Sequence, residues 1–410
     1  MIDAQDAPQI LEHLQKSLTL TLYDTKWVPG AAKFVAVGQH ARGTGALQVY
    51  ALEGPEAVLA RSLEGPAGFK CATFGASSIS EPRLAVGTFA GRLQVWDVEA
   101  GKAPAWDAQA HASIAYGFGP PELVTCGRDG CVRVWDVRQH DAPTAAFEPA
   151  DPTNVRDCWC VAFGNSFDDE ERCVLAGYDN GDVKLFDLRM NRVNYNTRRA
   201  AATRGSAHVH GRRRRAAPRA AHASHARAPR AALPPRAAQL RWEANVKNGV
   251  CGVSFDRRDI PMNKFVVTCL ESQMHVFDAR TQHPHKGFAS LTQVVTGGGG
   301  GAAAGGGAGA GGSTVWGAHH LPQNRDVAMV AAGDGSLSLW RYRYPDQRKV
   351  KDQDGKELGV VGSMQQLASR TLSSQPVNGF DWSPDKAGLF VCSAFDQCLR
   401  VGFVTRLNKL

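Results

Sequence analysis

Long apolar runs and export signals are missing from this chain of 410 residues. No run approaches the roughly 18 apolar residues that a membrane-spanning helix needs, so we expect no contact with a membrane. The first residues, MIDAQDAPQI, include Asp3 and Asp6 and have neither the basic start nor the apolar centre of a secretory signal. None of the ten cysteines forms a CxxC pair, and most lie in apolar, strand-like runs. We therefore expect an intracellular protein whose thiols are reduced and packed in its core.

Acidic residues and lysine are missing from residues 191–239, which contain twelve arginines. The net charge of the whole chain is +8, so the remainder carries −4. The segment lacks any period and is typical of a disordered insertion. Its run of four arginines at 212–215 leaves a second hypothesis open, a nuclear chromatin or nucleic-acid-associated protein that binds phosphates through this segment. The same bias would also arise from a GC-rich stretch that is translated in error and is absent from the native protein.

Signatures of catalysis, metal binding and nucleotide binding are missing as well. No Ser/His/Asp or Cys/His arrangement stands out in the sequence. The histidines of the basic segment lack cysteine partners and zinc-finger spacing: His208, His210, His222 and His225. The Gly/Ala-rich loop 294–312 lacks the GK[ST] sequence and the following helix of a phosphate-binding loop, and we interpret it as a flexible linker. We expect no enzyme activity, no metal and no cofactor.

The most informative pattern that is present is a triplet of short strands, of which seven copies can be placed. Two apolar strands, the second ending in a Gly/Asp turn, precede a third strand in which apolar and polar residues alternate. The third strands are GALQVY (45–50), GRLQVWD (91–97), GCVRVWD (130–136), GDVKLFD (181–187), SQMHVFD (272–278), GSLSLWR (335–341) and QCLRVGF (397–403). The terminal aromatic residues of the first four third strands are 46, 39 and 51 residues apart, which fits the length of a four-stranded propeller blade. The next interval is 91 residues and falls to 42 without the 49-residue basic segment.

This repeat predicts an all-β fold, a seven-bladed β-propeller of the WD-repeat type. The last copy ends after its third strand, and a three-stranded blade would leave an open edge. We expect residues 8–22 to supply the missing fourth strand, so that an N-terminal strand closes the ring. Residues 1–410 would then form a single domain with two insertions, the basic segment and the Gly/Ala-rich loop.

Side chains at fixed positions of the repeat are expected to hold the blades together. An Asp at the turn between the second and third strands can accept backbone N–H bonds, beside a Gly that tolerates positive φ. A Trp or Phe at the end of the third strand supplies apolar area between blades, and the Asp after it completes the Trp-Asp dipeptide that names the repeat. His111 stands where the repeat has the His of a Gly-His pair. The residues given this structural role are Trp96, Asp97, His111, Asp129, Trp135, Asp136, Asp179, Phe186, Asp187, Phe277, Asp278, Asp334, Trp340 and Asp396.

Bulky residues at the turns between second and third strands are candidates for contact with partner proteins. They are Phe89, Arg128, Tyr178 and Phe395. Aromatic residues and arginine are the types that anchor protein interfaces. The alternative is that these side chains pack on a neighbouring blade. The loop 343–357 is strongly charged, and we interpret it as a solvated surface that could also steer a partner.

Several strings are far more specific than the generic repeat. They are ARGTG (41–45), GYDNGDVKLFDLR (177–189), NGVCGVSFDRRDI (248–260), RTQHPHKGFAS (280–290), HLPQNR (320–325) and WSPDKAGLFVCSAFDQCLRV (382–401). They resemble the Monad family of WD-repeat factors of axonemal dynein assembly, over nearly the whole chain outside the insertions. The resemblance implies a cytoplasmic, cilium-associated adaptor that works with RuvB-like ATPases and prefoldin-like co-chaperones on dynein heavy chains. It implies a monomer within a larger complex and does not favour nucleic acid as a partner.

Three stretches depart from the pattern of this family. Residues 191–239 and 294–312 have no counterpart in it, and the blade around 111–121 is short. These departures put in doubt the first strand of the third blade and the outer strand of the fourth blade. If the basic segment is a clean insertion, LRWEANV (240–246) resumes the fourth blade as its outer strand.

Overall fold

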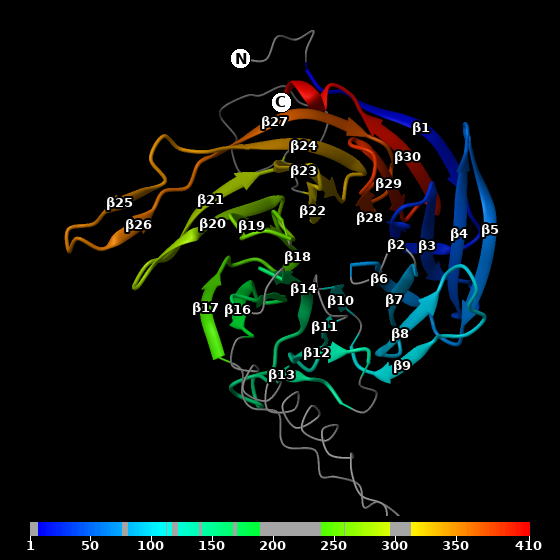
Figure 1. Ribbon diagram of the computed structural model, residues 1–410, viewed down its shortest axis with the longest axis horizontal. Coiled ribbons are helices and arrows are strands. Elements are labelled where there is room, and N and C mark those ends of the chain that lie inside the picture. The colour runs from blue at the N-terminus through cyan, green and yellow to red at the C-terminus, as the bar shows by residue number, and fades with distance from the viewer. Residues whose placement is uncertain are drawn as a thin grey trace, which may run out of the picture.

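Seven antiparallel sheets of four strands each surround a central axis (Figure 1). The structure is a computed structural model that describes residues 7–75, 81–111, 113–116, 122–138, 142–166, 170–188, 239–257, 259–295 and 313–410. Each sheet is one blade, and its strands follow one another from the axis outward. The predicted all-β, seven-bladed propeller is therefore confirmed.

Blades 1 to 3 are formed by consecutive strands of the first part of the chain. Blade 1 contains β2 (Thr21–Trp27), β3 (Lys33–Gln39), β4 (Gly45–Glu53) and β5 (Glu56–Gly65). Blade 2 contains β6 (Phe69–Thr73), β7 (Arg83–Thr88), β8 (Arg92–Asp97) and β9 (Trp106–Gln109). Blade 3 contains β10 (Ser113–Tyr116), β11 (Glu122–Cys126), β12 (Val132–Asp136) and β13 (Ala145–Phe147). The first strand of blade 3 is thus present.

Blades 4 to 7 complete the ring. Blade 4 contains β14 (Cys158–Gly164), β15 (Cys173–Tyr178), β16 (Asp182–Asp187) and β17 (Gln239–Asn245). Blade 5 contains β18 (Val250–Phe255), β19 (Lys264–Cys269), β20 (Gln273–His283) and β21 (Gly287–Val294). Blade 6 contains β22 (Val315–Leu321), β23 (Asn324–Ala332), β24 (Ser336–Arg343) and β27 (Ser363–Thr371). Blade 7 contains β28 (Val377–Trp382), β29 (Leu389–Ala394), β30 (Cys398–Val404) and β1 (Ile10–Ser17), and a 3₁₀ helix, η2 (Leu407–Lys409), follows β30.

The ring closes between the two ends of the described chain. Strand β1 runs antiparallel to β30, from the pair Ile10↔Val404 to the pair Ser17↔Cys398, and the two lie side by side in Figure 1. Closure by an N-terminal strand is therefore confirmed. The predicted range of 8–22 was too long at its end, because β2 of blade 1 already begins at Thr21. A connection of three residues, 18–20, separates the two strands, which belong to neighbouring blades, and its Leu20 is buried in the core.

The basic segment leaves blade 4 between its third and outer strands. Strand β17 pairs with β16 from Asp182↔Asn245 to Asp187↔Gln239, so the outer strand resumes as predicted. Of the basic segment, only Gln239 belongs to the described residues, and the expectation of disorder lies outside them. The same holds for the Gly/Ala-rich loop. Its first two residues, Val294 and Val295, are described, and the described chain resumes at residue 313, just after the loop.

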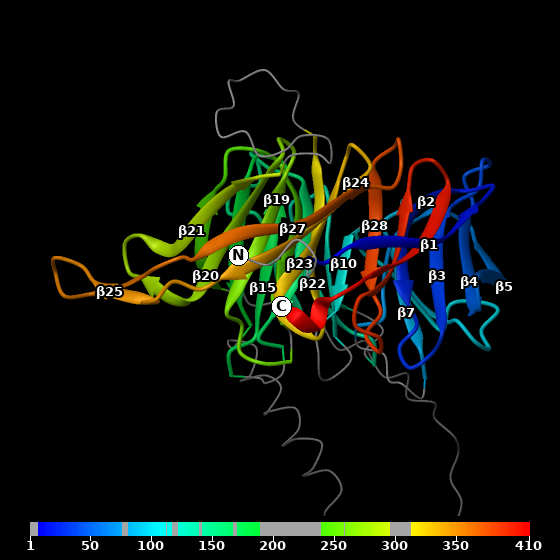
Figure 2. The ribbon, with the colours of Figure 1, turned by 90° about the horizontal axis from the view of Figure 1, so that it is seen from above.

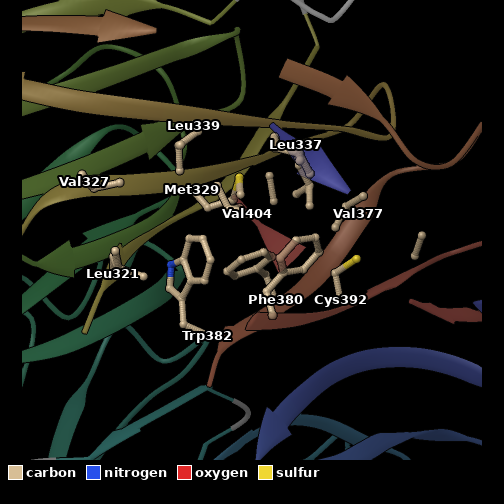
Figure 3. Close-up of a cluster of buried hydrophobic side chains, with 14 residues drawn as sticks. Leu321, Val327, Met329, Leu337, Leu339, Val377, Phe380, Trp382, Cys392 and Val404 are labelled. Atoms are coloured by element: carbon tan, nitrogen blue, oxygen red, sulfur yellow. The ribbon is translucent and has the colours of Figure 1, made fainter. Parts of the chain in front are cut away.

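The hydrophobic core lies mainly between neighbouring blades. Strand β15 has both faces covered and is buried along its whole length, whereas the outer strand β21 alternates between less and more exposed residues. Figure 3 shows the core between blades 6 and 7, where Met329 and Leu339 face Phe380 and Trp382. Ile10 of the closing strand is buried in this same cluster. The seam of the ring is thus packed as well as hydrogen-bonded.

The charged stretch 343–357 is an ordered hairpin and not a simple loop. Strands β25 (Lys349–Lys351) and β26 (Glu357–Gly359) pair with each other and extend outward beyond the ring beside β20 and β21 (Figure 2). Nε2 of buried His283 lies 2.8 Å from a carboxylate oxygen of Asp352 at the hairpin turn. At the hairpin's base, the Arg348 guanidinium donates to Asp278 at 2.7 Å. The sequence suggested that the charged side chains of this stretch are solvated. Two of them, Asp352 and Arg348, instead attach the hairpin to blade 5.

Candidate protein-binding face

A β-bulge recurs near the start of the inner strand in six of the seven blades. In each case one residue has no partner across the ladder, and its neighbours pair with consecutive residues of the second strand. The six bulged residues are Tyr23, Lys70, Trp159, Cys251, Trp316 and Asn378. A bulge changes the direction of a side chain and interrupts the alternation of the strand. Large aromatic residues can therefore occupy this position without entering the core.

Turns between second and third strands lie at the same end of the propeller as the bulges. The N–H of Phe89 donates to the carbonyl of Gly68, just before β6, at 2.9 Å. The N–H of Phe395 donates in the same way to Pro376, just before β28, at 3.1 Å. These bonds hold the first residue after the second strand beside the start of the inner strand. Phe89 is 47% exposed and Phe395 is 36% exposed.

Four aromatic side chains from blades 6, 7, 1 and 2 form a continuous surface, which we call the aromatic arc: Trp316, Phe395, Tyr23 and Phe89. The ring centroids of Trp316 and Phe395 are 6.2 Å apart, and those of Phe395 and Tyr23 are 6.3 Å apart. The ring centroids of Tyr23 and Phe89 are 4.8 Å apart. All three contacts are edge-to-face, the geometry that aromatic pairs prefer. Exposed aromatic groups of this size are typical of binding surfaces.

The four predicted contact residues are divided by the structure. Phe89 and Phe395 belong to the aromatic arc. The Arg128 side chain is 94% exposed on blade 3, and its Nε lies 3.8 Å from a carboxylate oxygen of Asp157. Tyr178 is only 6% exposed, so its proposed place on the surface was wrong. It is the last residue of β15 and packs between blades 3 and 4, where its hydroxyl donates to the carbonyl of Gly130 at 3.5 Å.

Sequence reasoning missed Tyr23 and Trp316, half of the aromatic arc. It concentrated on turns, whereas these two residues lie on bulged positions of inner strands. A signal was available in the sequence, because an apolar residue, a large residue and then a small or polar residue follow one another in LYD (22–24), CWC (158–160) and VWG (315–317). This order breaks the continuous apolar run expected of an inner strand.

The predicted turn aspartates occupy two different roles. Oδ1 of Asp129, Asp334 and Asp396 accepts the backbone N–H two residues later, at 3.2, 3.0 and 3.0 Å. In blade 4 the equivalent acceptor is Asn180, which receives the N–H of Asp182 at 3.1 Å. The role predicted for Asp179 was therefore wrong by one residue. The turn glycine, Gly181, follows Asn180 and has a φ of 87°.

The aromatic residues at the ends of third strands are all buried between blades. Each lies in a cluster with residues of the preceding blade: Trp96, Trp135, Phe186, Phe277 and Trp340. The aspartates that follow some of them fix the next turn. Asp97 accepts the N–H groups of Glu99 and Ala100 at 2.9 Å each, and these bonds lower the pKa of Asp97.

Asp136 and Asp278 accept the N–H of Arg138 and Arg280 at 3.0 and 2.9 Å. Both carboxylates also pair with a guanidinium, Asp136 with Arg138 and Asp278 with Arg348, each at 2.7 Å. Asp187 is buried at the equivalent place in blade 4. These aspartates thus hold the turn after the third strand.

Several packed thiols are held in their protonated form. Burial raises the pKa of Cys71, Cys251 and Cys392 to about 12. A thiol is nucleophilic and binds metal as the thiolate, so these cysteines are unreactive at neutral pH. Among the described residues, no group of three His, Cys, Asp or Glu side chains is placed to hold a metal ion. No helix in the described part of the chain is long and apolar enough to cross a membrane.

Known proteins similar to this chain cover its whole length. It is 58% identical to the dynein axonemal assembly factor 10 of Chlamydomonas reinhardtii over 419 aligned residues, which cover 100% of both chains. It is 46% identical to that of Xenopus laevis over 99% of both chains, and 45% identical to that of Homo sapiens over 100% of both. The chain belongs to the dynein axonemal assembly factor 10 family.

One segment of this dynein axonemal assembly factor 10 family member, residues 109–136, matches the protein-family model for the WD domain, G-beta repeat. The matched segment contains two sets of polar contacts, of which the first is buried. The indole N–H of Trp135 donates to Oγ1 of Thr125 at 2.9 Å. Nδ1 of His111 lies 3.2 Å from both Asp129 and Arg133. Burial, together with the positive charge of Arg133, lowers the pKa of His111 to about 4.

Proposed function

We propose that this chain is a non-catalytic scaffold of axonemal dynein arm preassembly, which binds its partners at the aromatic arc. The observation that carries the proposal is the arc itself, four partly exposed aromatic rings on a closed ring of blades. Family membership supplies the process, because the relatives are named dynein axonemal assembly factors. We propose further that residues 1–410 fold as one domain.

The proposed partners are proteins of three kinds: RuvB-like ATPases, prefoldin-like co-chaperones and dynein heavy chains. The proposed place of action is the cytoplasm of cells that build motile cilia, where the chain acts as a co-chaperone factor and as a monomer within a larger complex. A rigid ring suits this role, since its closed seam leaves no blade free to fray. Aromatic anchors at one end then supply affinity without requiring the ring to change shape.

A co-purification experiment tests the proposal. The tagged full-length chain is expressed in cells with motile cilia, as the wild type and as the double variant Phe89→Ser, Phe395→Ser. Dynein heavy chains and RuvB-like ATPases should be enriched with the wild type and reduced at least about tenfold with the double variant, since a single hot-spot residue costs about 2 kcal/mol or more.

Leu59→Ser is the matched control, because Leu59 is also 47% exposed but lies on the outer strand β5 of blade 1. It should co-purify partners as the wild type does. The proposal fails if neither partner class is enriched with the wild type, or if the Leu59 variant loses partners to the same extent as the arc variant.

A further inference from the structure

Two rings of the aromatic arc carry a polar hydrogen that the fold leaves unused. Neither the hydroxyl of Tyr23 nor the indole N–H of Trp316 has a hydrogen-bond partner among the described residues. Some buried indoles elsewhere in the ring do have an acceptor, since Trp96 donates to Gln94 and Trp340 donates to Ser338, whereas the indole nitrogen of Trp27 is buried without a partner among the described residues. The arc therefore combines apolar area with two donors that are free to meet a ligand.

A positive charge without a counter-ion lies at one end of the arc. Lys70 occupies in blade 2 the bulged position that Tyr23 occupies in blade 1. It immediately follows Gly68 and Phe69, and the backbone of Gly68 is bonded to Phe89. Among the described residues, no carboxylate pairs with the Lys70 ammonium. A ligand that lies along the arc and carries a carboxylate at this end would supply the missing charge.

The spacing of three of the four rings matches a particular backbone conformation, whereas the last step, from Tyr23 to Phe89, is shorter at 4.8 Å. The ring centroids of Trp316 and Phe395 are 6.2 Å apart, and their ring planes are turned by 82°. Those of Phe395 and Tyr23 are 6.3 Å apart, with the planes turned by 77°. Two residues of a polyproline II helix advance about 6.2 Å. Proline-rich segments in this conformation bind to rows of aromatic side chains.

Resting on the proposed partner-binding role of the arc, we propose that its ligand is a proline-rich segment of a partner protein in the polyproline II conformation, flanked by an acidic residue that pairs with Lys70. Proline has no N–H, so such a segment presents carbonyl acceptors with no donors of its own to satisfy. The Tyr23 hydroxyl and the Trp316 N–H supply the matching donors. An amphipathic helix would leave both donors unpaired, because its carbonyls are already bonded within the helix.

Binding of defined peptides to the full-length chain tests this assignment. The probe is a fluorescent decaproline with an aspartate at each end, and its anisotropy is measured against protein concentration. Comparison peptides are decaproline with lysine at each end, a Gly/Ser peptide with aspartate ends, and an amphipathic helical peptide. The aspartate decaproline should bind best, with the lysine form about tenfold weaker. Equal or tighter binding of the Gly/Ser or the helical peptide, or no binding of decaproline, overturns the proposal.

Three conservative variants locate the contact. Tyr23→Phe and Trp316→Phe keep a ring and remove the donor, and each should weaken decaproline binding about 3- to 10-fold. Lys70→Gln should remove the preference for aspartate ends over lysine ends. Trp159→Phe is the control, since Trp159 is likewise bulged and 36% exposed but lies on blade 4. Circular dichroism shows whether each variant is folded. Unchanged affinity in both donor variants, or an equal loss in the Trp159 variant, contradicts the assignment.

The outcome is separable from the scaffold proposal. If decaproline does not bind but the Phe89, Phe395 double variant still loses dynein heavy chains, the arc is a partner face for another kind of ligand and only the polyproline assignment falls. If decaproline binds but no dynein or RuvB-like protein co-purifies with the wild type, the peptide site stands and the assembly role falls.

Discussion

Aromatic side chains in this propeller lie in two kinds of place, between the blades and at the arc-bearing end. Trp96 is buried between blades 1 and 2, and its indole N–H is bonded to Gln94. Phe89, only seven residues earlier in the sequence, is 47% exposed and touches another exposed ring. Both residues belong to blade 2. The comparison shows that residue type alone does not separate a stabilising aromatic from a binding one, and that position relative to the strand end does.

The strongest test of this difference replaces one residue from each place. Trp96→Ala removes a buried ring and should lower the free energy of unfolding by about 3 to 5 kcal/mol, because it leaves a cavity. Phe89→Ala removes an exposed ring and should cost less than about 1 kcal/mol. Urea denaturation followed by far-ultraviolet circular dichroism measures both. A similar loss in the two variants would show that the arc contributes to the fold and is not a free surface.

Lowering the pH should reduce the stability of the interior between blades and leave the aromatic arc unchanged. His111 is 7% exposed, and its pKa is about 4 in the folded chain against 6.5 as the ordinary value. The unfolded chain therefore takes up a proton first, and the stability that depends on neutral His111 is lost as the pH falls from about 6.5 to about 4. Burial also lowers the pKa values of His319 and His320, to about 3 and about 4, which acts in the same direction. Phe89, Phe395 and Trp316 carry no titratable group.

The free energy of unfolding should therefore fall between pH 7 and pH 4.5, with about 2 kcal/mol of the change due to His111. His111→Gln should reduce the pH dependence by that amount, measured as the difference between urea midpoints at the two pH values. Leu59→Ser provides the control, since it changes an exposed residue without a titratable group and should leave the dependence as it is. If His111→Gln and the wild type lose stability in parallel, the imidazole is not kept neutral by its surroundings.

Gly127 is part of those surroundings, because a Cβ there would lie 2.2 Å from the His111 ring.

The fold was predictable from the sequence because its determinants are local. Alternation with a period of two marks the third strands, and glycine or Asx residues mark the turns before them, so the number of blades could be counted. The closing strand followed from the missing fourth strand of the last blade. The arc was only half predictable. Tyr23 and Trp316 are exposed because a bulge turns them out of the ladder, and a bulge depends on pairing between strands. Tyr178 was misplaced because the strand continues one residue further than the pattern indicates.

The smallest expected effect concerns the turn after Tyr178, where two neighbouring residues are chemically alike and structurally different. Oδ1 of Asn180 accepts the N–H of Asp182 at 3.1 Å, and its amide donates to the Asp182 carboxylate at 2.9 Å. Asp179 makes no such bond, and its Oδ1 is buried without a hydrogen-bond partner among the described residues. Asn180→Ala should therefore cost about 1 kcal/mol of unfolding free energy, whereas Asp179→Ala should be neutral or slightly stabilising. Differential scanning fluorimetry of the two variants measures the contrast, and the opposite order would mean that Asp179, as first expected from the sequence, fixes this turn.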